Sequence, residues 1–105
     1  MYSQRVVTGQ SFFLLYLDSP KGIVSLKGNL IENLYVHPSE QRKGYGTQLL
    51  RYVEELCSDK PTLWVLSNNQ STISLYRRED YEFTGNRRKL RSNLAELEMQ
   101  HNIFN

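Results

Sequence analysis

A short polar turn carries the residues of this chain that are best suited to bind an anion. Residues 41–47 place Gly44 and Gly46 between an apolar segment and an amphipathic one, with Arg42 and Lys43 just before them. A strand that leads through a glycine turn into a helix often holds a phosphate, because the first helical amides lack intrahelical partners and the helix dipole adds positive charge. Glycine also lets a ligand oxygen approach the backbone closely.

The spacing Gln41-x-x-Gly44-x-Gly46 resembles the pyrophosphate-binding motif of the GCN5-related N-acetyltransferases. It is neither a Walker loop nor the dinucleotide fingerprint, because its glycines are too close together and too few. Taken alone, the turn is explained equally well as a helix start that uses glycine. The resemblance assigns the pyrophosphate of coenzyme A to one set of residues: Gln41, Arg42, Lys43, Gly44, Tyr45, Gly46 and Thr47.

Three apolar segments precede the turn and are predicted to form antiparallel strands. They cover residues 11–17, 23–27 and 30–36. The first is aromatic and aliphatic throughout, which is typical of a strand buried on both faces. Residues 18–22 have the composition of a turn, and Gly28 with Asn29 predicts a tight hairpin turn. Residues 1–10 carry little pattern and are either a short strand or a loose arm.

An amphipathic helix is predicted from Tyr45 to Ser58, before Pro61. Its apolar residues form one stripe that faces a sheet: Leu49, Leu50, Val53, Leu56 and Cys57. Cys57 is therefore expected to be a small core residue rather than a nucleophile. A buried strand follows at 62–66, and the order strand–helix–strand implies a parallel pair with a right-handed crossover.

The last third of the chain is predicted to be a helix at 72–79 and a strand that begins at 81–84. Ile73, Leu75 and Tyr76 are placed toward the core. Residues 90–99 fit either a helix or a hairpin. We favour the hairpin, partly because the resemblance to the acetyltransferases calls for it.

The segment Asn69-x-x-Thr72-x-x-x-Tyr76, with the residues that follow it, is similar to a second acetyltransferase signature. Thr72 stands where the family has alanine, and Asp80-Tyr81 stands where it has Gly-Phe. The two signatures occur in the right order, with a helix and a strand between them, and the resemblance covers roughly residues 11–99. The chain is identified as a single-domain member of this superfamily over residues 1–105, which implies an α/β fold with a mixed α+β sheet, the acyl-CoA N-acyltransferase fold.

Family members usually begin with a strand and two helices that wall off the acceptor side. Here the apolar strands begin at about residue 11, so the fold is expected to be N-terminally abridged. The cofactor half is present and most of the acceptor half is not. The resemblance implies acetyl-CoA as co-substrate, no metal, and a small-molecule or peptide amine as acceptor, whose identity the sequence does not give.

The resemblance also suggests how acetyl transfer is arranged. The backbone of Leu34, Tyr35 and Val36 would align the pantetheine arm, and Asn69 would hold the same arm, cap the second helix, or do both. Tyr76 would protonate the departing thiolate, because a phenol keeps its proton at neutral pH. The alternative for Tyr76 is that its ring only packs under the helix.

Glu32 is the candidate for the base that deprotonates the amine, since it is the only carboxylate of its strand. By strand alternation it is predicted to share a face with Leu34 and Val36. The alternatives are an exposed or ion-paired glutamate, with water as the base. His37, at the mouth of the turn, is the other candidate, although a histidine there is more often simply exposed.

A basic cluster late in the chain consists of Arg77, Arg78, Arg87, Arg88, Lys89 and Arg91. A solvated face is the simplest interpretation. Contact with the 3′-phosphate of coenzyme A or with an acidic partner is the sharper one.

Composition limits the remaining classes of function. A net charge of +2 is too small to imply nucleic acid or an anionic membrane, and no membrane span or signal sequence is evident. With a single cysteine, we expect a cytoplasmic protein. The leading hypothesis is acetyl transfer. The alternatives are an acyl-CoA-binding sensor or interaction module without turnover, and, last, a nucleic-acid-binding domain.

A homodimer is expected because the abridged chain would expose apolar side chains of the first predicted strand. These are Phe12, Phe13, Leu15 and Tyr16, which we expect to be only partly covered. The alternative is a monomer in which residues 1–10 fold back over that edge.

Overall fold

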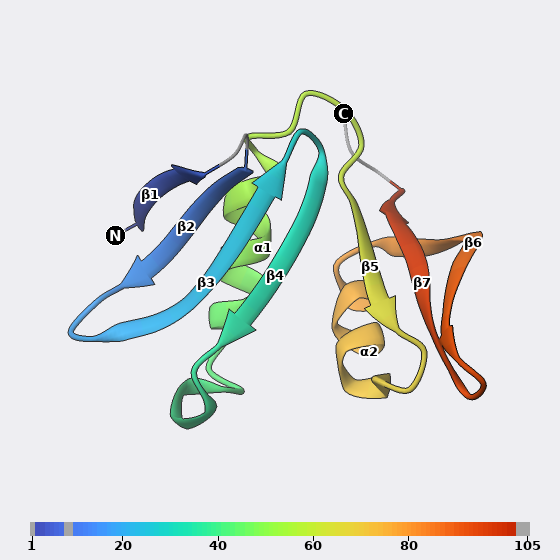
Figure 1. The fold of residues 1–105 in the computed structure, drawn as a ribbon. Coiled ribbons are helices and arrows are strands. Elements are labelled where there is room, and N and C mark those ends of the chain that lie inside the picture. The colour runs from blue at the N-terminus through green and yellow to red at the C-terminus, as the bar shows by residue number, and fades with distance from the viewer. Residues whose placement is uncertain (1, 8–9, 103–105) are drawn as a thin grey trace. The chain divides into compact units, whose positions relative to one another are not determined.

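In the computed structural model, the backbone is described for residues 2–7 and 10–102 and the side chains for residues 10–102. The chain forms two compact units, Met1–Ser58 and Asp59–Asn105. Each unit combines β-strands with an α-helix (Figure 1).

The first unit is an antiparallel sheet with a helix on one face (Figure 1). Its strands pair in chain order: β1 (Tyr2–Val7), β2 (Gln10–Tyr16), β3 (Pro20–Lys27) and β4 (Leu30–Val36). A short 3-10 helix, η1 (Pro38–Glu40), and the helix α1 (Tyr45–Glu54) follow. The three predicted strands are therefore confirmed, and the undecided N-terminal segment supplies a fourth. The predicted turn at 18–22 was too long, because β3 already begins at Pro20.

The core of the first unit lies between the sheet and α1. Phe13 and Leu15 of β2 are buried, and Leu49, Leu50 and Val53 of α1 are fully enclosed. The alternate residues of β2 are only half-buried, so β2 has one buried face, and the prediction of burial on both faces was wrong. The strand looked doubly buried because both of its faces are apolar in sequence.

The helix α1 ends at Glu54, four residues earlier than predicted. The amides of Glu55 and Leu56 both turn back to the carbonyl oxygen of Val53, which closes the helix in a tight turn. Leu56 is consequently half-exposed and does not join the apolar stripe. Cys57 is buried as predicted, and its thiol donates to the Val53 carbonyl at 3.4 Å.

The second unit contains a three-stranded antiparallel sheet and one helix. Its elements are β5 (Thr62–Leu66), α2 (Gln70–Arg78), β6 (Tyr81–Arg91) and β7 (Leu94–His101), with the strands in the order β5-β7-β6. The β6–β7 hairpin confirms the choice made for residues 90–99. β6 begins at Tyr81, as predicted, and its register with β7 shifts around Gly85, whose φ is 95°.

The core of the second unit is formed by both its sheet and its helix. Leu63, Tyr81, Ala95 and Met99 are buried in the strands, and Ile73 and Tyr76 are buried on α2. Leu75, predicted to face the core, is half-buried. The predicted parallel pairing of β4 with β5 involves both units and stays a prediction. Neither described α-helix has the length and apolar character that a membrane crossing requires.

Candidate functional site

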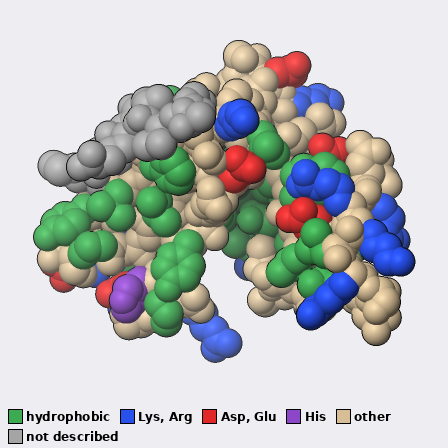
Figure 2. Space-filling model, in the orientation of Figure 1, with side chains coloured by type: hydrophobic (Ala, Val, Ile, Leu, Met, Phe, Trp, Pro, Cys, Tyr) green, Lys and Arg blue, Asp and Glu red, His purple; other side chains and the backbone are tan. Residues whose placement is uncertain are grey.

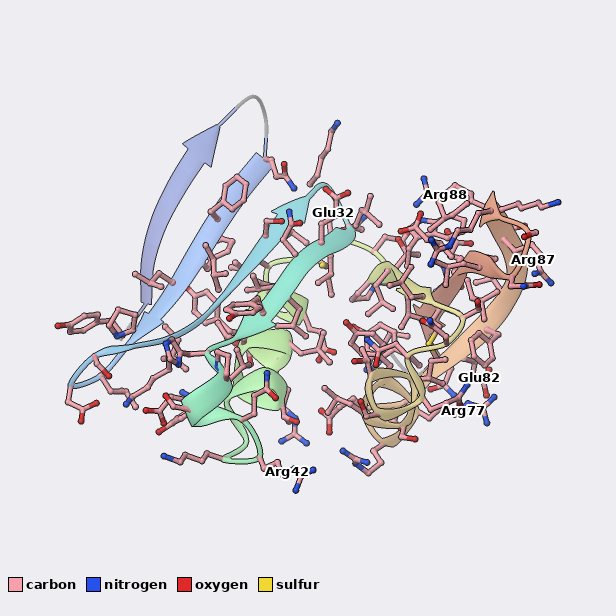
Figure 3. All side chains as sticks on the ribbon, turned by 60° about the horizontal axis from the view of Figure 1, so that its bottom comes forward. Glu32, Arg42, Arg77, Glu82, Arg87 and Arg88 are labelled. Carbon is pink, nitrogen blue, oxygen red and sulfur yellow. The ribbon has the colours of Figure 1, made fainter. Side chains whose placement is uncertain are left out.

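The turn between β4 and α1 is built from two residues in the left-handed backbone region. Arg42 has φ 68° and Gly44 has φ 85°, with the glycine at the N-cap of α1. Glycine adopts left-handed geometry easily, whereas arginine rarely does. The turn therefore holds Arg42 in a backbone conformation that arginine does not normally prefer. Arg42 projects from this turn in Figure 3.

The N-terminus of α1 presents backbone amides that no described side chain caps. The first helical bond joins the Gln48 amide to the Gly44 carbonyl at 3.0 Å. The amides of Tyr45, Gly46 and Thr47 come before that bond and so have no partner within the helix. Together with the helix dipole, these donors form an anion-binding arrangement.

The side chain of Gln41 closes the turn back onto the end of β4. Its Nε2 donates to the carbonyl oxygen of Val36 at 3.2 Å. His37 begins η1, where its Nδ1 accepts from the amide of Ser39 at 3.2 Å. The side chain of His37 therefore caps η1, and it is exposed to solvent. The Gln41 side chain thus makes a contact within the turn.

The charges beside the turn form a chain of ion pairs centred on Glu40. Its two oxygens lie 2.8 Å from Lys43 Nζ and 3.1 Å from Lys21 Nζ, and Lys21 also lies 2.7 Å from Asp18. The hydrogen bonds that Lys21 donates to Asp18 and Glu40 raise the pKa of Lys21 to about 12. Hydrogen bonds from Lys43 and Lys21 hold the pKa of Glu40 below its usual value.

These pairs distinguish the two cations of the turn. The charge of Lys43 is offset by Glu40, whereas Arg42 is exposed and forms no ion pair with any residue from 10 to 102. Arg42 is therefore the cation of this turn with uncompensated charge in the described structure. The side chain of Lys21 also lies under the turn, with its Nζ 5.9 Å from the ring centre of Tyr45.

A β-bulge in β4 changes the expected orientation of Glu32. Ser25 pairs with Glu32 and Ile23 pairs with Tyr35, so β4 carries one more residue than β3 between these pairs. Asn33 lies in the bulge with φ 52°. Because a bulge shifts the side-chain alternation by one, Glu32 shares a face with Tyr35, and the prediction that it faces with Leu34 and Val36 was wrong.

Glu32 stands on the sheet face away from α1 and is half-buried (Figure 3). Its Oε1 accepts a hydrogen bond of 2.7 Å from Gln10 Nε2. Glu32 is thus not fully exposed, and it forms no ion pair with residues 10–102. An exposed or ion-paired glutamate was the alternative to its role as a base. A carboxylate in this position can accept a proton from a ligand on that face.

At the end of β4, some backbone groups form hydrogen bonds to β3 and others point away from β3. The His37 amide donates to the Lys21 carbonyl at 2.9 Å, and Tyr35 pairs with Ile23. In an antiparallel ladder, successive residues point their amides in opposite directions. Val36 therefore directs its amide away from β3, where it can bond a group other than that strand.

Asn69 caps the N-terminus of α2 in the second unit. Its Oδ1 accepts from the Thr72 amide and from the Ser71 hydroxyl, both at 3.3 Å. Such a side-chain cap satisfies one of the open amides of the helix. Asn69 therefore caps the second helix, which is one of its two predicted roles. The cap uses Oδ1 and does not need the Nδ2 group.

Tyr76 is buried on α2 at 6% exposure. Its ring centre lies 5.8 Å from that of Tyr81, so the ring packs in the core of the unit. Burial raises the pKa of the Tyr76 hydroxyl to about 12. The phenol is thus a proton donor over the whole neutral range, whether or not it also serves as a packing residue.

The late basic cluster is partly occupied by its own neighbours. The Arg88 guanidinium lies 3.8 Å from the ring centre of Trp64 and 3.3 Å from Glu96, and Arg77 lies 4.9 Å from the ring centre of Phe83. The remaining members, Arg78, Arg87, Lys89 and Arg91, are exposed. Figure 2 shows basic side chains gathered over this part of the second unit.

A shallow hollow of about 370 Å³ lies beside Arg77 in the second unit. Asp80 and Glu82 also line it. Two carboxylates beside one guanidinium do not favour a phosphate, so the hollow gives no support to a 3′-phosphate site at Arg77.

Sequence reasoning missed a polar cluster beneath Glu32. Ser25 is fully buried in β3, yet its hydroxyl contacts Gln10, Glu32 and Asn33. The available signal was a serine in the middle of an otherwise apolar strand, which burial would leave unsatisfied unless polar partners were supplied.

Residues 8–83 of the chain match the family described as an acetyltransferase (GNAT) domain. The chain belongs to this family. The match spans the Gln41–Thr47 turn, Glu32, Asn69 and Tyr76, and it confirms the family predicted from the two signatures. No curated protein sequence matches the chain.

Solved structures share the GNAT fold at low sequence identity. The apo form of YjaB from Escherichia coli has a TM-score of 0.75 and 19% identity, over 86% of this chain and 63% of its own. A protein assigned as a streptothricin acetyltransferase from Bacillus anthracis, in complex with acetyl coenzyme A, has a TM-score of 0.78 and 17% identity, over 90% of this chain and 62% of its own.

The spermidine/spermine N-acetyltransferase SpeG from Vibrio cholerae, in complex with manganese ions, has a TM-score of 0.74 and 17% identity, over 89% of this chain and 65% of its own. These likenesses show that the protein has the mixed α/β fold of the GNAT acyltransferases. This GNAT chain spans less than two thirds of the length of each of these three structures.

Proposed function

We propose that this protein is an N-acetyltransferase that moves the acetyl group of acetyl-coenzyme A to a primary amine by direct attack. The observation that carries the proposal is the uncapped N-terminus of α1, preceded by the left-handed residues Arg42 and Gly44. Membership of the GNAT family supports it, as does the acetyl coenzyme A bound in the Bacillus anthracis structure of the same fold.

The pyrophosphate of coenzyme A would bind at the turn of residues 41–47. The amides of Tyr45, Gly46 and Thr47 would donate to its oxygens, and Arg42 would add an uncompensated positive charge. The backbone of Leu34, Tyr35 and Val36 would align the pantetheine arm, with the outward amide of Val36 best placed to do so. Asn69 would add a contact through its Nδ2 while its Oδ1 caps α2.

In the transfer step, the amine nitrogen forms a bond to the thioester carbonyl carbon, and the bond from that carbon to sulfur then breaks. A primary amine with a pKa near 10 is mostly protonated at pH 7, so a base must take a proton before or during attack. We assign this role to Glu32. The proton that neutralises the departing thiolate would come from Tyr76, whose raised pKa keeps it protonated.

The acceptor would be a small molecule or a peptide that carries a primary amine. SpeG and the streptothricin acetyltransferase, which share the fold, are named for spermidine and spermine and for streptothricin. A panel of polyamines, amino-sugar antibiotics and peptides with free N-termini therefore covers the chemistry to be tested. With acetyl-CoA as co-substrate, we expect the protein to act in the cytoplasm.

A homodimer remains part of the proposal, although the surface that supports it differs from the one predicted. Phe13 and Leu15 are buried against α1, so the expectation that they are only partly covered was wrong. Phe12 and Leu14 are half-buried on the opposite face, and Tyr16 is 45% exposed. Figure 2 looks onto this face and shows hydrophobic side chains there. Light scattering coupled to gel filtration should give twice the chain mass of 12.4 kDa.

Cofactor binding is tested with a matched pair of variants at Gly44. Asparagine and aspartate both tolerate the left-handed region, and space around Gly44 is open, so Gly44→Asn and Gly44→Asp differ mainly in charge. Calorimetric titration with coenzyme A should show affinity reduced by about 10²-fold or more in Gly44→Asp, since juxtaposed like charges cost several kcal/mol. Gly44→Asn should retain most of its affinity.

Thiol release with the amine panel then tests turnover. Release of coenzyme A that depends on an added amine supports the acetyltransferase. Binding of coenzyme A without amine-dependent release would instead favour an acyl-CoA-binding sensor or interaction module. Equal titration of the wild type and Gly44→Asp would refute the cofactor site itself.

A further inference from the structure

A polar cluster joins three strands of the first unit beneath Glu32. Gln10 of β2 donates through Nε2 to Glu32 Oε1 at 2.7 Å and to Ser25 Oγ at 2.9 Å. The Nδ2 of Asn33 donates to the same Ser25 oxygen at 2.9 Å. Ser25 Oγ in turn donates to the carbonyl oxygen of Glu32 at 3.0 Å.

The hydroxyl of Ser25 uses its full hydrogen-bonding capacity in this cluster. A serine hydroxyl has one hydrogen to donate and two lone pairs to accept with, and here all three are used. The residue is fully buried. Loss of any partner would leave part of the hydrogen-bonding capacity of this buried hydroxyl unsatisfied.

The cluster holds Glu32 at two points. Ser25 binds its main-chain carbonyl and Gln10 binds its carboxylate. Asn33, whose left-handed backbone makes the bulge, is held by the same serine. The second carboxylate oxygen of Glu32, Oε2, makes no hydrogen bond or ion pair with residues 10–102.

We propose that Gln10, Ser25 and Asn33 are positioning residues that fix the bulge of β4 and hold the Glu32 carboxylate in the orientation in which it takes the proton of the acceptor amine. This inference rests on the proposed function. Gln10 occupies Oε1 and thereby presents Oε2, and the serine and asparagine hold the backbone that determines the face on which Glu32 lies.

Stability alone does not require this arrangement. Apolar residues of similar shape can replace both partners of a buried hydrogen bond at little cost, so an apolar sheet could be built without the cluster. The feature that an apolar replacement would lose is the fixed direction of one carboxylate. Misplacement of a reacting group by about 1 Å can cost about 10²-fold in rate, which gives such a fixed direction functional value.

The test is a double-mutant cycle between Gln10 and Glu32, read as kcat and KM in the amine-dependent thiol-release assay. Gln10→Met keeps the length of the side chain and removes both hydrogen bonds. It should lower kcat by about tenfold, with the KM for acetyl-CoA unchanged. Glu32→Gln should lower kcat by about 10²-fold. The double variant should be no slower than Glu32→Gln, because Gln10 acts only through Glu32.

Gln100→Met serves as the matched control, since Gln100 is also a half-buried strand glutamine but lies in β7 of the second unit. It should leave kcat unchanged. Asn33→Gly is the second positioning variant, because glycine accepts the left-handed backbone while the bond to Ser25 is lost. It should reproduce the effect of Gln10→Met and its dependence on Glu32, and it replaces that variant in the cycle if Gln10→Met does not fold.

The outcomes separate this inference from the proposed function. Multiplied effects in the double variant, about 10³-fold in total, would overturn the positioning role while leaving Glu32 as the base. A wild-type kcat in both Gln10→Met and Asn33→Gly would do the same. A wild-type protein that binds coenzyme A but releases no thiol with any amine would refute the acetyltransferase, and the positioning role with it.

Discussion

Leu49 of α1 packs against Gly22 of β3 so closely that a Cβ on the glycine would lie 2.8 Å from the leucine Cδ1. The same Cβ would lie 2.6 Å from the carbonyl oxygen of Tyr35 in β4. Glycine is therefore required here for the close approach of three elements. It sets how near α1 lies to the strand that leads into the turn.

Gly22→Ala should destabilise the protein by about 1–3 kcal/mol, the usual range for inserting a methyl group into a packed site. The methyl group would meet backbone, which cannot move aside as a flexible side chain can. Urea unfolding followed by circular dichroism measures the change. Gly28→Asn is the control, because space around Gly28 is open and asparagine tolerates its φ of 61°. A midpoint for Gly22→Ala equal to that of the control would contradict this packing.

Tyr76→Phe should lower kcat by about 10²-fold or more, within the range for general acid catalysis, with little change in affinity for coenzyme A. The phenylalanine keeps the ring contact with Tyr81, so the thermal midpoint should change little. Because burial raises the pKa of Tyr76 to about 12, kcat should not fall through loss of its proton until the pH approaches that value. A kcat near that of the wild type would show that Tyr76 is a packing residue and not the general acid.

Arg42→Gln should weaken coenzyme A binding by about tenfold, the effect of losing one hydrogen bond to a charged group. Lys43→Gln should weaken it less, because Glu40 already offsets the charge of Lys43. Calorimetric titrations at two salt concentrations measure both effects, and the salt dependence should decrease more in Arg42→Gln. A larger loss in Lys43→Gln would show that Lys43 leaves Glu40 to bind the cofactor.

Glu40→Gln should flatten the acid side of the stability profile. Lys43 and Lys21 hold the pKa of Glu40 below 4.5 in the folded state. A carboxyl group with a lowered folded pKa stabilises the fold above its unfolded pKa, and this contribution disappears as the pH falls through the folded value. Wild-type stability should therefore fall more steeply than that of Glu40→Gln as the pH drops below about 4.5. Urea midpoints measured from pH 6 to pH 3 test this.

Local signals predicted much of the fold. Gly28 with Asn29 indicated the β3–β4 hairpin, and Asn69 was expected to cap α2. In each case the signal is a backbone preference of one or two residues and acts whatever surrounds it. The glycines of the turn gave the correct location of the start of α1 for the same reason.

The bulge at Asn33 was not predictable in this way. Alternation along β4 assumes one residue opposite each residue of β3, and an insertion reverses the face of every residue on one side of it. Only pairing with β3 reveals the extra residue. The face of Glu32 therefore depended on a tertiary contact, and so did the exposure of Leu56, which follows from the early end of α1.

Cys57 gives the protein a useful chemical property. Burial, with a smaller contribution from Glu54, raises the pKa of its thiol to about 11, so the folded protein carries almost no thiolate at pH 8. It is the only cysteine of the chain. A thiol-reactive dye added during turnover would therefore report released coenzyme A against a silent protein background. The same dye, added with denaturant, would label a single site just past the end of α1 and time the opening of that part of the core.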